Sequence, residues 1–216
     1  MVLVGLAVNE IFHSIQGEST HAGRPCVFVR LSGCNLRCVW CDTAYAFDEG
    51  RAMSIDEILA EVRRYDCELV EVTGGEPLLQ AEAIPLMRAL LAEGLEVLLE
   101  TGGSLPIRDV PRGVRRIVDV KCPGSGEASR NLWENLGGLR KGDELKFVIA
   151  DREDYLWAVE TIRARRLAGR VPLLFSPVHG RLDPATLGRW VLADRLPVRV
   201  QIQLHKVLWP EVARGV

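Results

Sequence analysis

The chain has 216 residues, of which 48% are hydrophobic and 26% charged, and this composition is ordinary for a globular domain with a sizeable core. A formal net charge of −2 gives no electrostatic case for nucleic-acid binding, and no apolar run approaches the ~20 residues that span a membrane. We therefore expect one domain, residues 1–216, that binds neither nucleic acid nor membrane.

Strand-like and helix-like patterns alternate along the chain. The apolar stretch 1–8 lacks a basic segment ahead of it and is interpreted as a strand, not as a signal peptide. Further β-rich runs predict strands at 25–32, 69–73, 95–100, 116–121, 144–149, 171–176 and 198–204. Helices are predicted from a capping box at Ser54–Glu57 and at Ala81–Glu93, Asp151–Arg166 and Asp183–Ala193. Such alternation favours a parallel sheet, whose ligands gather at the carboxyl ends of the strands.

The second strand leads into a cluster of cysteines. Cys34, Cys38 and Cys41 form a C-x3-C-x2-C run. Three thiolates at this spacing suit a [4Fe–4S] cluster with one iron left open to a small molecule, because closed clusters and structural zinc sites take four ligands. The alternative is a closed four-ligand site completed by Cys67, Cys122 or a histidine. Without an export signal, six cysteines fit a reducing cytoplasm and a metal cluster better than disulfides.

A glycine-rich turn follows the predicted strand at 69–73. In Thr73-Gly74-Gly75-Glu76-Pro77 the glycines remove side chains, so backbone groups can approach a ligand, and Glu76 adds an acceptor. Alone this is an ordinary turn. After a C-x3-C-x2-C loop, it completes a pair of motifs that resembles the radical S-adenosylmethionine (SAM) enzymes.

The flanking sequence is similar to the 7-carboxy-7-deazaguanine synthases over nearly the whole chain. The similar stretches are Asn9–Glu18, Arg24–Cys34, Trp40–Thr43 and Gln203–Trp209. The resemblance implies a partial, six-stranded parallel barrel of the TIM type. It also implies a carbon–nitrogen lyase that converts 6-carboxy-5,6,7,8-tetrahydropterin to 7-carboxy-7-deazaguanine with release of ammonia, toward queuosine and other 7-deazapurines.

The same resemblance implies cofactors and partners: a [4Fe–4S] cluster, SAM, Mg2+, an external electron donor such as flavodoxin or ferredoxin, and a homodimer in the cytoplasm. Cys34, Cys38 and Cys41 would hold the cluster, and Thr43 would be the Mg2+ ligand, with no such role for the adjacent Asp42. The expected SAM contacts are Trp40, Asp42, Gly74, Gly75, Glu76, Thr101, Lys121, Lys146 and Ser176. The expected substrate contacts are Ile15, Gln16, Gly17, Glu18, Arg30, Thr73, His205 and the terminal residue Val216. No side chain is assigned as an acid or base catalyst.

Two other functions share some of these features. An activating radical SAM enzyme, which installs a glycyl radical on a protein, has the same cysteine loop but no need of a small-molecule pocket. A zinc or iron–sulfur binding module would have a closed site and no affinity for SAM. The stretch His13–Glu18 and the His205–Trp209 end favour a small-molecule pocket.

Overall fold

The computed structural model describes residues 5–216, and the first part of the strand predicted at 1–8 lies outside them. One nine-stranded sheet dominates the described chain, in the order β3-β1-β2-β4-β5-β6-β7-β8-β9. The strands from β2 to β9 run parallel, whereas β1 pairs antiparallel with both β2 and β3. The bounds are Leu6–Ile15 (β1), Pro25–Leu31 (β2), Arg51–Met53 (β3), Leu69–Gly74 (β4), Glu96–Thr101 (β5), Arg115–Asp119 (β6), Glu144–Ile149 (β7), Leu173–Pro177 (β8) and Arg199–Val200 (β9).

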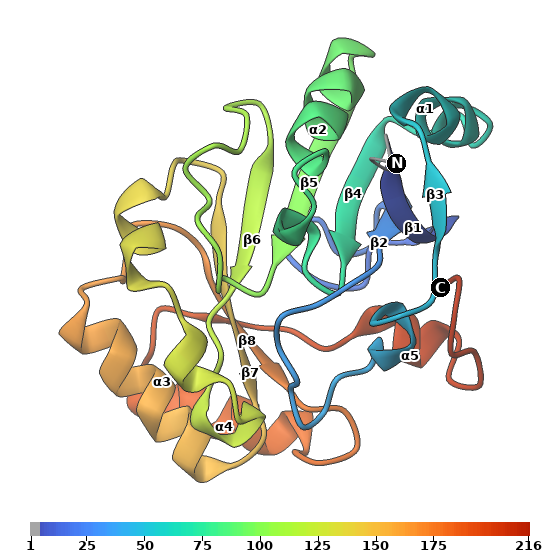
Figure 1. Cartoon of the computed structure of the whole chain (residues 1–216). Helices are drawn as coiled ribbons and strands as arrows, with labels where there is room; N and C mark the ends of the chain where they lie inside the picture. Colours follow the sequence, from blue (N-terminus) through green and yellow to red (C-terminus); the bar gives the residue numbers. More distant parts are fainter. Residues whose placement is uncertain (1–4) are drawn as a thin grey trace.

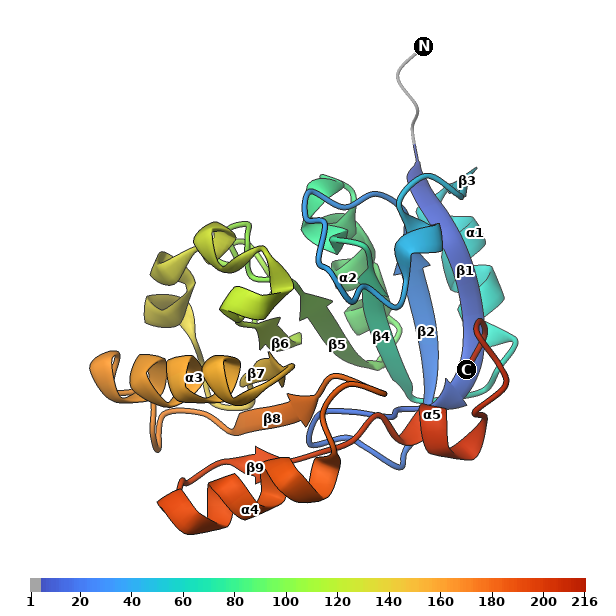
Figure 2. The ribbon, with the colours of Figure 1, turned by 90° about the horizontal axis from the view of Figure 1, so that it is seen from below.

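The sheet curls into an open barrel, with helices packed outside it (Figure 1; Figure 2). The helices are α1 (Ile55–Arg63), α2 (Ala83–Ala92), α3 (Arg152–Ala164), α4 (Pro184–Asp194) and the short α5 (Leu204–Leu208). Short 3-10 turns lie at Ala44–Ala46, Pro77–Leu79, Pro123–Ser125, Ala128–Arg130 and Trp133–Gly138. The expected partial barrel is confirmed: six parallel strands of five to seven residues form it, and the two-residue β9 extends it.

The four predicted helices are present. Ser54 accepts a hydrogen bond from Glu57 N, and the Glu57 side chain accepts one from Ser54 N, so the capping box exists as expected. The prediction was wrong at 198–204, where only two residues form a strand. Leu204 instead donates its N–H to the carbonyl of Gly17, at the far edge of the sheet, and α5 begins there.

Side chains alternate between the two faces of the parallel strands. On β2, Val27, Val29 and Leu31 pack outward into the main core beneath the helices, whereas Cys26 and Phe28 point inward. The inward residues form an apolar plug across the amino-terminal end of the barrel: Phe12, Cys26, Phe28, Leu69, Leu98 and Ile117. Phe12 and Phe28 stack with ring centroids 4.9 Å apart. The plug leaves the carboxyl ends of the strands for ligands.

The C-terminal segment, residues 201–216, crosses from β9 to the other edge of the sheet. Figures 1 and 2 show this red segment passing from β9 to α5, beside β1 and β2. It therefore covers the seam that an open barrel leaves between its edges. Within residues 5–216, no helix is both long and apolar enough to cross a membrane.

Candidate active site

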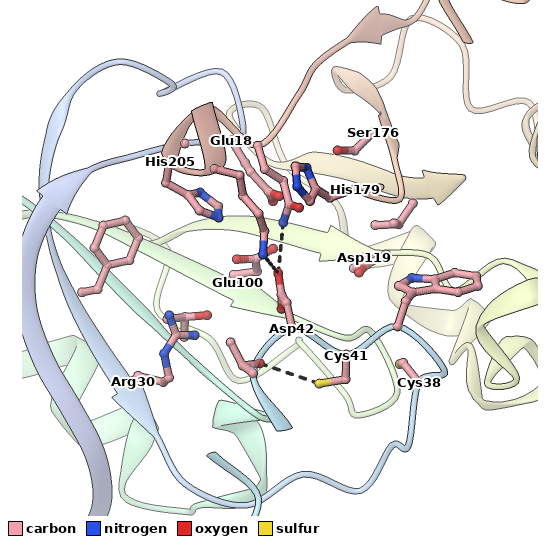
Figure 3. Close-up of a pocket in the computed structure, with 18 of the residues that line it drawn as sticks. Glu18, Arg30, Cys38, Cys41, Asp42, Glu100, Asp119, Ser176, His179 and His205 are labelled. Carbon is pink, nitrogen blue, oxygen red and sulfur yellow. Dashed lines mark hydrogen bonds and ion pairs between the residues drawn. The ribbon is translucent and has the colours of Figure 1, made fainter. Parts of the chain in front are cut away.

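A cavity of about 640 Å³ opens at the carboxyl ends of the parallel strands. Its wall brings together the cysteine loop, the ends of β2, β4, β5, β7 and β8, and the C-terminal segment. Figure 3 shows Glu18, Glu100 and His205 on one side, Cys38 and Cys41 on the other, and Asp42 between them. Of the residues expected from the sequence, all but Glu76 line this cavity.

The cysteine loop lies against the end of β4. Glu76 N donates to Gly33 O at 2.8 Å, and Gly75 N donates to Leu31 O at 3.2 Å. A Cβ at Gly75 would stand 2.3 Å from Gly33 O and 2.7 Å from the Cβ of Cys34, so only glycine allows this approach. The two motifs singled out in the sequence are therefore packed directly against each other.

The three loop cysteines fit the thiolate set of an open cubane cluster. All three are free, partly exposed and line the same cavity. Burial raises the pKa of Cys34 and of Cys38, and a metal bound to these sulfurs would favour the thiolate form. In the described residues, no three His, Cys, Asp or Glu side chains gather closely enough to hold a single ion. A cluster binds each thiolate to a different iron, so its ligands lie farther apart than those of one zinc ion. Cys122 is buried, and neither it nor Cys67 lines the cavity.

The side chain of Glu76 does not line the cavity and is buried between the ends of β4 and β5. Its carboxylate is fully buried and accepts hydrogen bonds from Thr101 Oγ1, Gly102 N and Leu78 N. Burial raises its pKa, and these donors act against that rise. Glu76 thus joins the end of β4 to the end of β5 and leaves the backbone of Gly74 and Gly75, together with Thr101, on the cavity wall.

Lys121 and Trp40 lie near the cysteine loop. Lys121 Nζ donates to Asp119 Oδ2 at 2.6 Å, and Asp119 also lines the cavity. Burial would lower the pKa of Lys121, but the charge of Asp119 keeps it raised, so Lys121 is a cation. The Arg181 guanidinium lies 5.5 Å from the ring centroid of Trp40. Ser176, near the end of β8, is buried and also lines the cavity.

A polar floor lies directly above the apolar plug and consists of Gln16, Glu18, Glu71, Glu100 and Lys146. Glu71 and Glu100 stand two positions beyond Leu69 and Leu98 on their strands, and so on the same inner face. Lys146 Nζ lies 2.6 Å from Glu18 Oε2 and also contacts Glu100. Burial would raise the pKa of Glu100, but the charge of Lys146 lowers it, whereas burial leaves the pKa of Glu18 raised.

Arg30 is the cation beside Thr73, its neighbour across the β2–β4 ladder. Its Nε donates to Glu10 Oε1 at 2.8 Å, and the hydroxyl of Tyr45 donates to the same oxygen at 2.9 Å. This single contact to Glu10 leaves other guanidinium N–H groups of Arg30 free for a carboxylate in the cavity.

The C-terminal segment is fastened to the residues that follow the cysteine loop. Gln203 Nε2 donates to Asp42 Oδ2 at 3.1 Å, and Lys206 Nζ lies 3.7 Å from the same oxygen. His205 packs on Gly17, where a Cβ would lie 2.3 Å from its Nδ1, and burial lowers the pKa of His205. Val216 reaches the cavity wall. Thr43 also lines it, with its hydroxyl 3.8 Å from Cys41 Sγ.

The sequence did not single out several residues that the structure brings to the cavity. Glu71, Glu100, Asp119, Tyr45, Gln203 and Lys206 are the polar ones discussed above. Glu71 carried a signal, since it is the lone acid of an apolar strand and lies two residues before Thr73, on the same face of that strand. Glu100 shares its strand with a second acid, Glu96, and its signal is its place at the carboxyl end, beside Thr101. Gln203 and Lys206 lie in the stretch Gln203–Trp209 that resembles the family, but nothing in the sequence pointed to their contact with Asp42, which is far away along the chain.

Comparison with known proteins places these features in a family. Residues 28–122 match the family model of the Radical SAM superfamily. The chain is 48% identical to a 7-carboxy-7-deazaguanine synthase of Koribacter versatilis, over 98% of this chain and 100% of the relative. It is 49% identical to that of Chlorobaculum tepidum, over 98% and 97%.

The fold has counterparts among solved structures. The crystal structure of QueE from Escherichia coli superposes with a TM-score of 0.78 at 23% identity, covering 93% of this chain and 95% of that one. Streptococcus suis SuiB bound to precursor peptide SuiA gives 0.57 at 13% identity, over 83% of this chain and 49% of the other. At these identities the likeness concerns the fold.

Proposed function

Since the chain belongs to the 7-carboxy-7-deazaguanine synthase family of radical SAM proteins, we propose that its cavity converts 6-carboxy-5,6,7,8-tetrahydropterin to 7-carboxy-7-deazaguanine with release of ammonia. The observation that carries this proposal is the meeting of the cysteine loop, the Gly74–Gly75 strand end and the polar floor in one cavity. A radical SAM lyase needs a reductive cofactor site and a small-molecule site to share one chamber.

The residues divide that chamber into two parts. Cys34, Cys38 and Cys41 would hold a [4Fe–4S] cluster, and the strand ends at Gly74, Gly75, Thr101, Lys121, Lys146 and Ser176, with Trp40 and Asp42, would hold SAM. Glu76 would act from behind this wall by fixing Thr101 and Gly102. When bound, cluster and SAM together supply a carbon-centred radical that can abstract hydrogen from the substrate.

The other part is suited to a polar bicycle. Gln16, Gly17 and Glu18 with the carbonyl of Ile15 would accept hydrogen bonds from its amino-pyrimidine edge, and Thr73 and His205 would border the ring. Arg30 would bind the carboxylate. Thr43 would carry Mg2+, which takes oxygen ligands and keeps waters and substrate oxygens. Val216 is proposed to close the substrate side.

Further parts of the proposal concern partners. We expect a homodimer in the cytoplasm and an external donor such as flavodoxin or ferredoxin. Exposed apolar side chains at Ile202, Val207 and Leu208 offer one surface for self-association. The exposed tip of the cysteine loop at Val39 is one point of approach for a donor.

The test is anaerobic. The protein is reconstituted with iron and sulfide, then given SAM, reductant, Mg2+ and 6-carboxytetrahydropterin, and the products are analysed by mass spectrometry. We expect 7-carboxy-7-deazaguanine. Formation of 5′-deoxyadenosine without that product, or SAM cleavage that responds only to a protein partner, would refute the proposed substrate.

A further inference from the structure

Glu71 is a fully buried carboxyl group for which the proposed chemistry has no role. It stands on β4 inside the barrel, with a side chain about 1% exposed, directly above the apolar plug. Its neighbours across the ladders are Phe28 on β2 and Leu98 on β5, so its surroundings are apolar on both sides.

No cation pairs with Glu71 among the described residues. The ammonium of Lys146, from β7, contacts Glu18 and Glu100 instead. The other ionisable groups that face Glu71 are Glu18, from the loop after β1, Glu100, from β5, and the thiol of Cys26, from β2. All three of these groups are acids, so an ionised Glu71 would add a second uncompensated negative charge to the buried floor of the cavity. Such a charge is too costly to bury.

The hydrogen bonds of Glu71 are those of a neutral acid. Gln16 Nε2 donates a hydrogen bond to Glu71 Oε2. The carbonyl oxygen of a neutral carboxylic acid accepts such a bond as well as a carboxylate oxygen does. Glu100 stands two residues beyond Leu98, the ladder neighbour of Glu71, so the two carboxyl groups lie on the same inner face of adjacent strands. Glu100 raises the pKa of Glu71 further, and two carboxyl groups can hydrogen-bond to each other only through a shared proton. Glu100 is the ionised member because it contacts Lys146.

We propose that Glu71 is held as a neutral carboxylic acid that positions Gln16 and Glu100 in the floor of the substrate site. Gln16 also accepts a hydrogen bond from Glu18 N at 2.6 Å through its Oε1. Its amide orientation, fixed at one end by Glu71, therefore sets the Gln16–Glu18 turn that reads the amino-pyrimidine edge. Glu71 is thus a positioning residue for substrate specificity, and this role rests on the proposed function. Burial raises the pKa of Glu71 well above its usual range, in agreement with the neutral form.

Two variants separate the neutral acid from an ionised one. Glu71→Gln keeps an oxygen that accepts from Gln16 and an N–H that donates to Glu100, so it reproduces the neutral acid without a titrating proton. Glu71→Val keeps the volume and removes both bonds. Glu68→Gln, an exposed acid one residue before the strand, is the matched control.

The first measurement is the urea midpoint of the reconstituted protein as a function of pH, which needs no knowledge of the substrate. A raised pKa in the folded state means that wild-type stability falls as pH rises from the unfolded value of 4.5 toward the folded value. Glu71→Gln lacks this fall, so we expect its advantage over wild type to grow with pH, whereas Glu68→Gln shows no such trend. A Glu71→Gln protein that is less stable than wild type at neutral pH, with a deficit that does not shrink as pH rises, would overturn the neutral form.

The second measurement is steady-state kinetics on the same proteins. We expect Glu71→Gln to retain the wild-type KM for the carboxypterin, and Glu71→Val to raise it about tenfold with the KM for SAM unchanged. Equal rises for both ligands would assign Glu71 to the fold alone. If no variant, wild type included, turns over the carboxypterin, the proposed function fails, while the stability arm still decides the protonation of Glu71.

Discussion

The amide of Gln203 lies 3.1 Å from the carboxylate of Asp42, and this contact joins the C-terminal segment to the residue that follows the last cysteine of the loop. Lys206 lies 3.7 Å from the same carboxylate, and Arg214 pairs with Glu49 at 2.7 Å farther along. These contacts hold residues 201–216 across the seam of the barrel. This part of the cavity wall is therefore attached to the cysteine loop as well as to the sheet.

Asp42→Ala should loosen this attachment. Burial would raise the pKa of Asp42, but the Gln203 hydrogen bond and the charge of Lys206 lower it, so the anion is the form that holds the segment. The side chain is 44% exposed, so each contact contributes only about 1 kcal/mol or less. We expect the KM for the carboxypterin to rise about fivefold at unchanged iron content, measured by steady-state kinetics and iron analysis. Asp48→Ala, an exposed acid of the same loop, is the control, and an equal effect there would refute the specific role of Asp42.

Replacement of Cys34, Cys38 or Cys41 by Ala should abolish both the visible absorbance of the reconstituted cluster and SAM cleavage, because two thiolates do not hold a cubane. Absorbance spectroscopy measures the cluster, and detection of 5′-deoxyadenosine measures SAM cleavage. Cys67→Ala should leave both unchanged, since Cys67 lies outside the cavity wall. A loop variant that keeps both properties would remove that cysteine from the ligand set.

Thr43→Ala should weaken the dependence of turnover on Mg2+ by removing an oxygen ligand from the cavity wall. The measurement is the product formation rate during Mg2+ titration. Thr43→Ser retains the hydroxyl and should restore the wild-type titration. If the Ala variant responds to Mg2+ as wild type does, the metal is held elsewhere.

Lys146→Met should destabilise the protein by about 3 kcal/mol, because it leaves Glu18 and Glu100 without their cation. The pKa shifts of Glu100 and Lys146 determine how the stability from this contact changes with pH. The lowered pKa of Glu100 gives stability that is present above 4.5 and is lost as pH falls, and the raised pKa of Lys146 gives stability present below 10.5. The deficit should therefore be largest near neutral pH and shrink in acid.

Urea unfolding at several pH values measures this deficit. Lys141→Met, at an exposed lysine, should change the unfolding free energy little. A constant deficit across the acid range would show that lost packing, not lost charge, explains the Lys146 variant.

The residue pattern predicted most of the barrel and, with the exception of Glu76, residues that the structure brings to the cavity wall. Apolar strands such as Leu95–Leu99 and the capping box at Ser54 are local signals, and local structure follows them. The strand predicted at 198–204 was wrong because β9 is an edge, and contacts with Gly17, distant in sequence, outweigh the β propensity of Ile202. Glu76 was expected to meet a ligand, yet its carboxylate is taken by Thr101 and Gly102, which only the folded ladder brings near.

The apolar plug has a consequence for traffic through the enzyme. Phe12, Phe28 and Leu98 close the amino-terminal end of the barrel, so everything that enters the chamber does so past the ends of the strands. SAM, the carboxypterin, 5′-deoxyadenosine and the product would then all enter or leave through the same opening of the cavity. The compound that lies nearest to the plug would have to bind first and leave last, so binding and release would be ordered. Accumulated product would then inhibit the entry of fresh substrate.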